Sequence, residues 1–303
     1  MKKKSLITAR GKQLHQEVMG QTGRAEELSE AMLDHLRRFH SLNEIYDKDV
    51  EEEILTEELN HIRNPRKLNF ERGLVLFSPS SASKCERELY YKAKHEQKDE
   101  VQMFPYQRRW VRNGSAVHAA VQKDLLLAEV HLKNPAFTVE KMPDGSAAWE
   151  HNLKNVKQVE HNGIRFQISG MMDGILHYMK DKSRIGFEFK TKSTTLGAIG
   201  HYKMKDAQEG HKEQAIAYSI LFGINEFIFL YESLAKDGWM KGIEAKPDLR
   251  AFYFRPTDDQ KNGLLDKFAR VAAKVKADEL PSQELDKCIF CPFKQKCKAD
   301  GQS

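Results

Sequence analysis

The sequence lacks the features that mark a membrane protein, a secreted protein or a nucleotide-driven motor. No stretch of the 303 residues is long and apolar enough to span a bilayer. The basic start, Met1–Lys4, runs into polar sequence around 10–16 rather than into the apolar segment of a secretory signal. The sequence also has no G-x-x-x-x-G-K-[ST] loop, internal repeat or low-complexity segment, which excludes a P-loop ATPase and a repeat array. We therefore expect a cytoplasmic protein with no membrane partner.

Cysteine and proline are also scarce, with 4 and 9 residues, and neither sign of charge dominates. Four cysteines in an intracellular chain of this size indicate metal ligation rather than a disulfide framework, provided that their spacing agrees. The 49 basic and 44 acidic residues give a net charge of +5, which only mildly favours a polyanionic partner. A hydrophobic fraction of 40% is typical of a globular protein with a substantial core.

The hydrophobic pattern predicts an α/β protein whose sheet is flanked by helices. Helices are expected at 25–42, 50–62, 106–130, 206–222 and 258–277, and strands at 170–178, 184–191, 227–231 and 249–254. A shorter helix is expected through Tyr91, with Cys85 in its first turn or two. Asp144-Gly145 and Asn162-Gly163 predict hairpin turns. We divide the chain into an N-terminal helical region (1–75), a core (76–280) and a C-terminal cysteine-bearing loop (281–303).

Two strand-like segments carry the side chains with the clearest chemistry. Asp173 interrupts the first segment, and the second contains Glu188 and Lys190 two positions apart. Because side chains alternate along a strand, Glu188 and Lys190 share one face while the flanking phenylalanines point the other way. If the strands are neighbours in a hairpin, Asp173 faces Glu188. A metal ion bridging both carboxylates, with Lys190 orienting water, would suit phosphodiester hydrolysis, and oxygen ligands favour Mg²⁺ or Mn²⁺.

A plainer explanation is a turn at Asp173 and a solvated strand face at Glu188 and Lys190, since E-x-K occurs by chance in most charged proteins. The flanking phenylalanines favour a partly buried site instead. Isolated buried charges are too costly to keep without a metal or a partner.

Two helices on either side of these strands add three more candidate residues. His118 lies in the helix before the strands, and Gln214 and Tyr218 lie four residues apart in the helix after them. Taken singly, a structural histidine and an ordinary helix face are the commoner explanations. Together, His118 could supply an imidazole ligand or a phosphate contact, while Gln214 and Tyr218 grip a nucleotide.

The order G-x-x-x-H, then D, then E-x-K, then Q-x-x-x-Y over 114–218 resembles the RecB-like branch of the PD-(D/E)xK nucleases. The resemblance implies a restriction-endonuclease-like fold, a mixed central sheet flanked by helices. It also implies metal ligation by His118, Asp173, Glu188 and the backbone carbonyl of Phe189. Catalysis would be carried by Asp173, Glu188 and Lys190, and Gln214 and Tyr218 would support the substrate or the geometry of the site.

The cysteines form a compact trio, Cys288-x2-Cys291-x5-Cys297, with Cys85 lying 203 positions (288 − 85) upstream of its first member. This arrangement resembles the iron–sulphur nucleases of AddB and of the CRISPR-associated exonucleases, with Phe293 in place of a frequent tyrosine. The resemblance implies a [4Fe-4S] cluster; structural Zn²⁺ and free buried cysteines are the alternatives. A bound cluster would restrict the unfolded chain by closing this long loop.

These features predict a Mg²⁺- or Mn²⁺-dependent DNA exonuclease acting on single-stranded or end-containing DNA. Recombination, repair, phage replication and CRISPR adaptation are the expected settings, with a helicase, a recombinase or a CRISPR adaptation protein as a possible partner. Two alternatives stay open. The protein could be a non-catalytic DNA-binding or assembly subunit with a structural cluster, or an endonuclease with the same chemistry.

Overall fold

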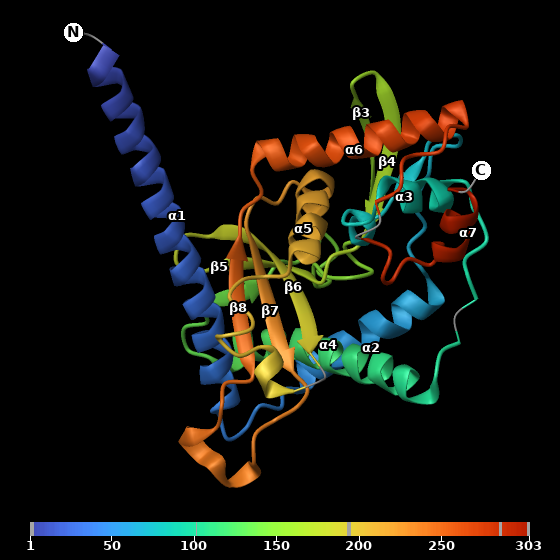
Figure 1. Ribbon diagram of the computed structural model, residues 1–303. Helices are drawn as coiled ribbons and strands as arrows, with labels where there is room; N and C mark the ends of the chain where they lie inside the picture. Colours follow the sequence, from blue (N-terminus) through green and yellow to red (C-terminus); the bar gives the residue numbers. More distant parts are fainter. Residues whose placement is uncertain (1–2, 101, 193–194, 285–286, 302–303) are drawn as a thin grey trace.

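The structure is a computed structural model that describes residues 3–100, 102–192, 195–284 and 287–301. It contains two sheets with helices packed around them (Figure 1). The helices are α1 (Lys3–His40), α2 (Lys48–Arg63), α3 (Glu86–Ala93), α4 (Pro105–His131), α5 (Glu209–Phe222), α6 (Asp258–Ala277) and α7 (Lys294–Ala299). The strands are β1 (Leu76–Phe77), β2 (Phe137–Val139), β3 (Asn155–His161), β4 (Ile164–Gly170), β5 (Gly174–Tyr178), β6 (Ser183–Lys192), β7 (Phe227–Ser233) and β8 (Leu249–Phe254).

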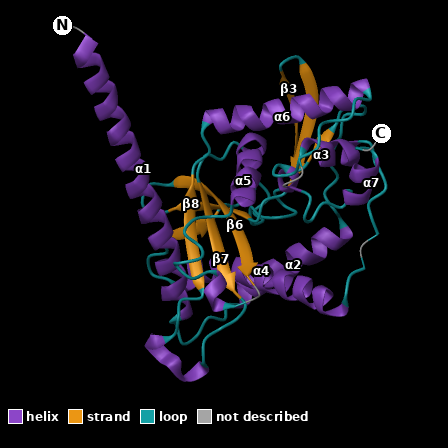
Figure 2. Ribbon diagram, viewed as in Figure 1, coloured by secondary structure: helices purple, strands orange, loops and turns teal. Residues whose placement is uncertain are grey.

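The larger sheet has five strands in the order β2-β5-β6-β7-β8. Only β6 and β7 run parallel, and α5 lies in the connection between them, as a parallel pair requires (Figure 2). The other neighbouring strands are antiparallel. The predicted fold class, an α/β protein with a mixed central sheet flanked by helices, is therefore confirmed.

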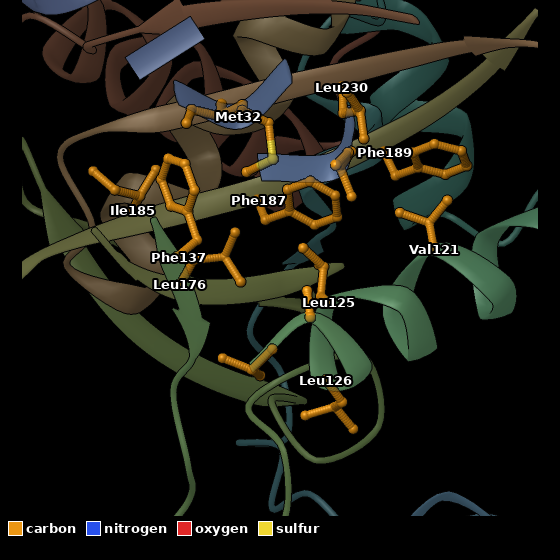
Figure 3. Close-up of a cluster of buried hydrophobic side chains, with 14 of the residues drawn as sticks. Met32, Val121, Leu125, Leu126, Phe137, Leu176, Ile185, Phe187, Phe189 and Leu230 are labelled. Atoms are coloured by element: carbon orange, nitrogen blue, oxygen red, sulfur yellow. The ribbon is translucent and has the colours of Figure 1, made fainter. Parts of the chain in front are cut away.

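Helices α1 and α4 cover one face of the larger sheet, and α5 covers the other. On the first face, Met32 of α1 and Leu125 of α4 belong to the same buried cluster as Phe187 and Phe189 of β6 (Figure 3). The phenylalanines on either side of Glu188 thus point into the core, as the alternation along the strand predicts. Helix α1 contributes directly to this core.

The smaller sheet has the order β1-β4-β3 and packs against α3, α5 and α6. Its hairpin turns at Asn162-Gly163, where φ is 51° and 74°, the left-handed geometry that this residue pair favours. At the other end of β4, a Cβ on Gly170 would lie 2.6 Å from Cδ of Pro79, so only glycine allows this close approach. The hairpin predicted at Asn162-Gly163 is confirmed.

Three sequence-based boundaries were wrong. The strand expected at 170–178 is divided, because β4 ends at Gly170 in the smaller sheet and β5 begins at Gly174 in the larger one. Asp173-Gly174 is a turn signal in this segment, but the hydrophobic pattern does not show which sheet each part joins. Cys85 is the N-cap of α3 rather than a residue of its first turns, and its Sγ accepts the backbone N–H of Glu88 at 3.3 Å. The expected C-terminal loop contains the short helix α7.

None of the helices within the described ranges is both long and apolar enough to cross a bilayer.

Candidate active site

The strand register brings the predicted acids together. Gly174 pairs with Phe187 across the antiparallel β5–β6 ladder, so Asp173 stands opposite Glu188. Asp173 Oδ2 accepts the backbone N–H of Phe189 at 2.8 Å, which ties the residue before β5 to the middle of β6. The predicted apposition of Asp173 and Glu188 is therefore present.

His118 approaches these strands from α4 and lies between two carboxylates. Its Nε2 is 3.0 Å from Asp173 Oδ2, and its Nδ1 is 3.1 Å from Glu150 Oε1. Burial lowers the pKa of His118, but the hydrogen bonds to Asp173 and Glu150 outweigh burial and raise the pKa to about 10. In the metal-free protein His118 is thus a cation that neutralises the carboxylates on either side.

Glu188 and Lys190 form a second pair of opposite charges. Glu188 is 1% exposed, and its Oε1 accepts a hydrogen bond from Lys190 Nζ. Burial and the nearby Asp173 charge raise the pKa of Glu188, while Lys190 opposes this shift. Glu188 Oε2 is buried and has no hydrogen-bond partner among the described residues. Such an orphaned carboxylate oxygen is costly unless another cation reaches it.

These side chains line an open cleft of about 550 Å³ between α4 and the end of β6. Its walls are formed by Gly114, Ser115, His118, Ala119, Glu150, Asp173, Phe189, Lys190 and Thr191. A Cβ on Gly114 would lie 3.4 Å from the Thr191 hydroxyl oxygen, so α4 passes close to β6 here. We call His118, Glu150, Asp173, Glu188 and Lys190 the carboxylate cluster.

Gln214 and Tyr218 lie behind this cluster rather than in the cleft. Tyr218 is buried in the core between α5 and the sheet. Its hydroxyl accepts a hydrogen bond from Gln214 Nε2 at 2.7 Å and donates one to the carbonyl of Met171 at 2.8 Å. The pair therefore fixes the link that carries Asp173, two residues after Met171.

Two residues of the site were missed by sequence reasoning. Gln122 Nε2 donates to the backbone carbonyl of Asp173 at 2.9 Å, and its position four residues after His118 on α4 was an available signal. Glu150 contacts His118 from a loop where its own φ is +39°. Its backbone N–H donates to the Met172 carbonyl at 2.7 Å. Nothing in the local sequence around Glu150 indicates this contact.

The four cysteines lie near the helices that pack against the smaller sheet. Cys291 and Cys297 pack against the same buried cluster as α3 and α6, and Cys85 belongs to the start of α3. Burial raises the pKa of the Cys291 thiol, and the charges of Glu88, Cys85 and Cys288 raise it further. We call Cys85, Cys288, Cys291 and Cys297 the cysteine cluster; all four are free thiols.

Arg87 of α3 fastens the C-terminal segment beside these thiols. Its guanidinium donates to the Pro281 carbonyl at 2.7 Å and to the Cys297 carbonyl at 3.4 Å, and it lies 3.8 Å from Cys297 Sγ. The Tyr91 hydroxyl also donates to Asp300 at 2.8 Å. Chain segments that precede α4 and follow α6 are therefore joined at the cysteine cluster.

Neither cluster has the spacing of a formed metal centre. Within the described ranges, no three His, Cys, Asp or Glu side chains are arranged as ligands around one point. In the carboxylate cluster, His118 contacts Asp173 and Lys190 contacts Glu188, so these carboxylate oxygens face protein cations rather than one shared point.

Comparison with known proteins gives matches at the level of structure only. No family model and no curated protein matches the sequence. The crystal structure of SSO0001 aligns with a TM-score of 0.43 and 17% identity, over 82% of this chain and 94% of that one. The alkaline exonuclease LHK-Exo from Laribacter hongkongensis aligns with a TM-score of 0.41 and 11% identity, over 76% of this chain and 96% of that one. Its complex with dAMP gives 0.41 and 12%, over 75% and 94%.

Proposed function

We propose that this protein is a metal-dependent deoxyribonuclease of the PD-(D/E)xK type that hydrolyses phosphodiester bonds. The observation that carries the proposal is that His118 of α4, Asp173 just before β5 and Lys190 of β6 line one cleft, with the buried Glu188 hydrogen-bonded to Lys190. Strongly perturbed ionisable groups that converge in a cleft are typical of catalytic sites.

A divalent cation fits the donor set of the carboxylate cluster. Glu188 Oε2 is the buried oxygen without a partner, and Asp173 stands across the ladder from it. Carboxylate oxygens of this kind suit Mg²⁺ or Mn²⁺. His118, Asp173, Glu188 and the Phe189 carbonyl would hold the ion, which would act as a Lewis acid toward the scissile phosphate.

The protein's own groups have distinct tasks around that ion. Lys190 holds a positive charge beside Glu188, where it can orient water and counter the charge that develops on the phosphate. Gln122 and Tyr218 fix the chain on either side of the Asp173 side chain, through the carbonyls of Asp173 and Met171. Gln214 and Tyr218 therefore act as positioning residues.

The proposal extends to the cysteine cluster, for which the donor chemistry fits a thiolate-bound [4Fe-4S] centre. The N–H of Glu88 already points at Cys85 Sγ, and the Arg87 guanidinium lies beside Cys297 Sγ. Donors of this kind stabilise negative thiolates. The cluster would be structural, and a structural Zn²⁺ is the alternative that iron analysis separates.

We propose that the substrate is single-stranded or end-containing DNA and that the protein acts as an exonuclease. The non-catalytic subunit is the less favoured alternative, because all of the motif residues are present in the sequence and His118, Asp173 and Lys190 line the cleft. An endonuclease would use the same chemistry. Recombination, repair, phage replication or CRISPR adaptation, with a helicase, recombinase or adaptation partner, would supply such DNA ends.

The test is a degradation assay with end-labelled single-stranded DNA, with Mg²⁺, with Mn²⁺ and with chelator. The expected result is metal-dependent shortening from one end. A circular single strand of the same sequence, resistant throughout, identifies an exonuclease, whereas its cleavage identifies an endonuclease. Absence of cleavage with either metal, in protein that contains its full complement of iron, would overturn the nuclease proposal.

A further inference from the structure

The beginning of α4 carries exposed aromatic side chains beside the candidate active site. Phe104, Tyr106 and Trp110 are 48%, 48% and 51% exposed. The rings of Phe104 and Tyr106 are stacked with centroids 6.1 Å apart, and Tyr106 meets Trp110 edge-on at 5.7 Å. Large aromatic side chains gathered on an exposed surface indicate a binding site, because the exposure of apolar surface to water is unfavourable.

The charged side chains on the first half of α4 are all basic. From Gln102 to Lys123 the chain has no aspartate or glutamate, but it has Arg108, Arg109 and Arg112 on the first half of α4. None of these three guanidinium groups forms an ion pair with any described residue, although Arg112 contacts its neighbour Asn113. Elsewhere Arg24, Arg165, Arg184 and Arg270 are each paired with a carboxylate. We call Phe104, Tyr106, Trp110 and these three arginines the α4 platform.

The platform leads directly into the cleft. One side of α4 carries a slowly turning stripe of residues at four-residue intervals: Tyr106, Trp110, Gly114 and His118. Further along, that side of α4 packs on the sheet, but the start of the helix extends beyond the sheet in Figure 1. Trp110 and His118 are about 12 Å apart along the helix axis, the length of three to four stacked nucleotides.

We propose that the α4 platform binds the single-stranded DNA substrate, with bases stacked on Tyr106 and Trp110 and the phosphates held by the arginines. The proposal rests on the proposed nuclease function and specifies its substrate as a single strand. Every base has a π-face, so stacking on aromatics grips a strand without reading its sequence, and the arginines supply the matching charge. A strand held this way reaches the carboxylate cluster through the cleft at Gly114.

The experiment measures binding without cleavage, by fluorescence anisotropy of a labelled 12-nucleotide oligodeoxynucleotide in chelator. We expect Trp110→Ala and Tyr106→Ala each to weaken binding about tenfold, as for the loss of one stacked base. The matched control is Trp239→Ala, since Trp239 is 97% exposed in the loop between β7 and β8 and should leave binding unchanged. Arg109→Gln should lower the slope of log K against log salt by about 0.7.

A second measurement detects stacking itself. DNA should quench the tryptophan fluorescence of the wild type and of Trp239→Phe, but not that of Trp110→Phe, which retains an aromatic ring and should bind within about threefold of wild type. Wild-type affinity in the doubly substituted Tyr106→Ala, Trp110→Ala protein would overturn the platform. If the doubly substituted protein sediments differently from the wild type but binds DNA equally well, this face binds a second copy of the chain. That result would also overturn the platform. Tighter binding of the matching oligoribonucleotide or of a blunt duplex would overturn the choice of single-stranded DNA.

The two proposals can fail separately. If the wild type binds DNA through the platform but cuts no DNA with Mg²⁺ or Mn²⁺, the nuclease function is wrong and the platform stands. If the wild type cuts DNA and the platform variants bind and cut as it does, the platform is wrong and the nuclease function stands.

Discussion

The carboxylate cluster is built around the adjacent strands β5 and β6 and helix α4, with Glu150 added from a loop, whereas the cysteine cluster joins segments far apart in the sequence. In the first, the β5–β6 ladder sets the position of Asp173 relative to Glu188, and buried phenylalanines fix β6. In the second, Arg87 and Tyr91 of α3 hold the C-terminal segment through Pro281, Cys297 and Asp300. The first cluster is therefore shaped by the sheet and α4, whereas the second, under the ligation proposed above, would gain stability from its bound metal.

The largest expected effect separates chemistry from folding in the carboxylate cluster. Lys190→Ala should reduce cleavage about 10³-fold, because the ammonium acts on the transition state rather than on ground-state binding. Gel-based single-turnover rates measure the loss, and calorimetry should show Mn²⁺ binding retained. The control is Lys180→Ala, which removes an exposed cation from the far end of the same hairpin. Near-native turnover by Lys190→Ala would falsify the catalytic role.

The opposite pattern is expected in the cysteine cluster. Cys85→Ala should lower the free energy of unfolding by about 4 kcal/mol and the melting temperature by roughly 10 °C, because losing any ligand opens a loop that spans the core. Cys291→Ala should be equally damaging. Protein purified without oxygen should contain about four irons per wild-type chain, absorb near roughly 400 nm and lose both properties in either variant.

Ser83→Ala, two residues before Cys85, is the control and should keep its iron. Colourless wild-type protein with one zinc ion would replace the iron–sulphur assignment by a zinc one. Full metal content and stability in Cys85→Ala would remove Cys85 from the cluster altogether.

A smaller effect should connect the core to the carboxylate cluster. Tyr218→Phe leaves the Met171 carbonyl and the Gln214 amide without their shared hydroxyl, so we expect a loss of about 1–3 kcal/mol in stability and about a tenfold slower cleavage. Tyr178→Phe is the matched control, because its hydroxyl bonds Glu27 on the other side of the sheet. Reduced stability with unchanged specific activity would make Tyr218 a core residue without a role in positioning Asp173.

The smallest effect concerns pH. The folded protein holds the His118 proton up to about pH 10, whereas the unfolded chain releases it near 6.5, so this group stabilises the metal-free fold below 6.5 and the contribution is lost as pH rises to 10. We expect a loss on the order of 2 kcal/mol over that range, measured by urea unfolding in chelator. His118→Gln should flatten the profile. An equally steep profile in His118→Gln would show that other groups produce the slope.

The carboxylate cluster was largely predictable because its signals are local. The two-residue period of β6 fixed which side chains share a face, and the four-residue spacing in α5 placed Gln214 beside Tyr218. Glu150 was not predictable, because its contact with His118 depends on a loop closing in three dimensions. The division between β4 and β5 was missed for a related reason, since the turn signal at Asp173-Gly174 does not show that the strands on either side join different sheets.

Because of that division, Asp173 lies in the link between the two sheets. The three residues Met171–Asp173 link the end of β4 in the smaller sheet to the start of β5 in the larger one. Glu188, in contrast, lies within β6 and pairs with Phe229 of β7. If the smaller sheet rotated against the larger one, Asp173 would move while Glu188 stayed in place. A force that acts on the smaller sheet would therefore change the separation of the two acids.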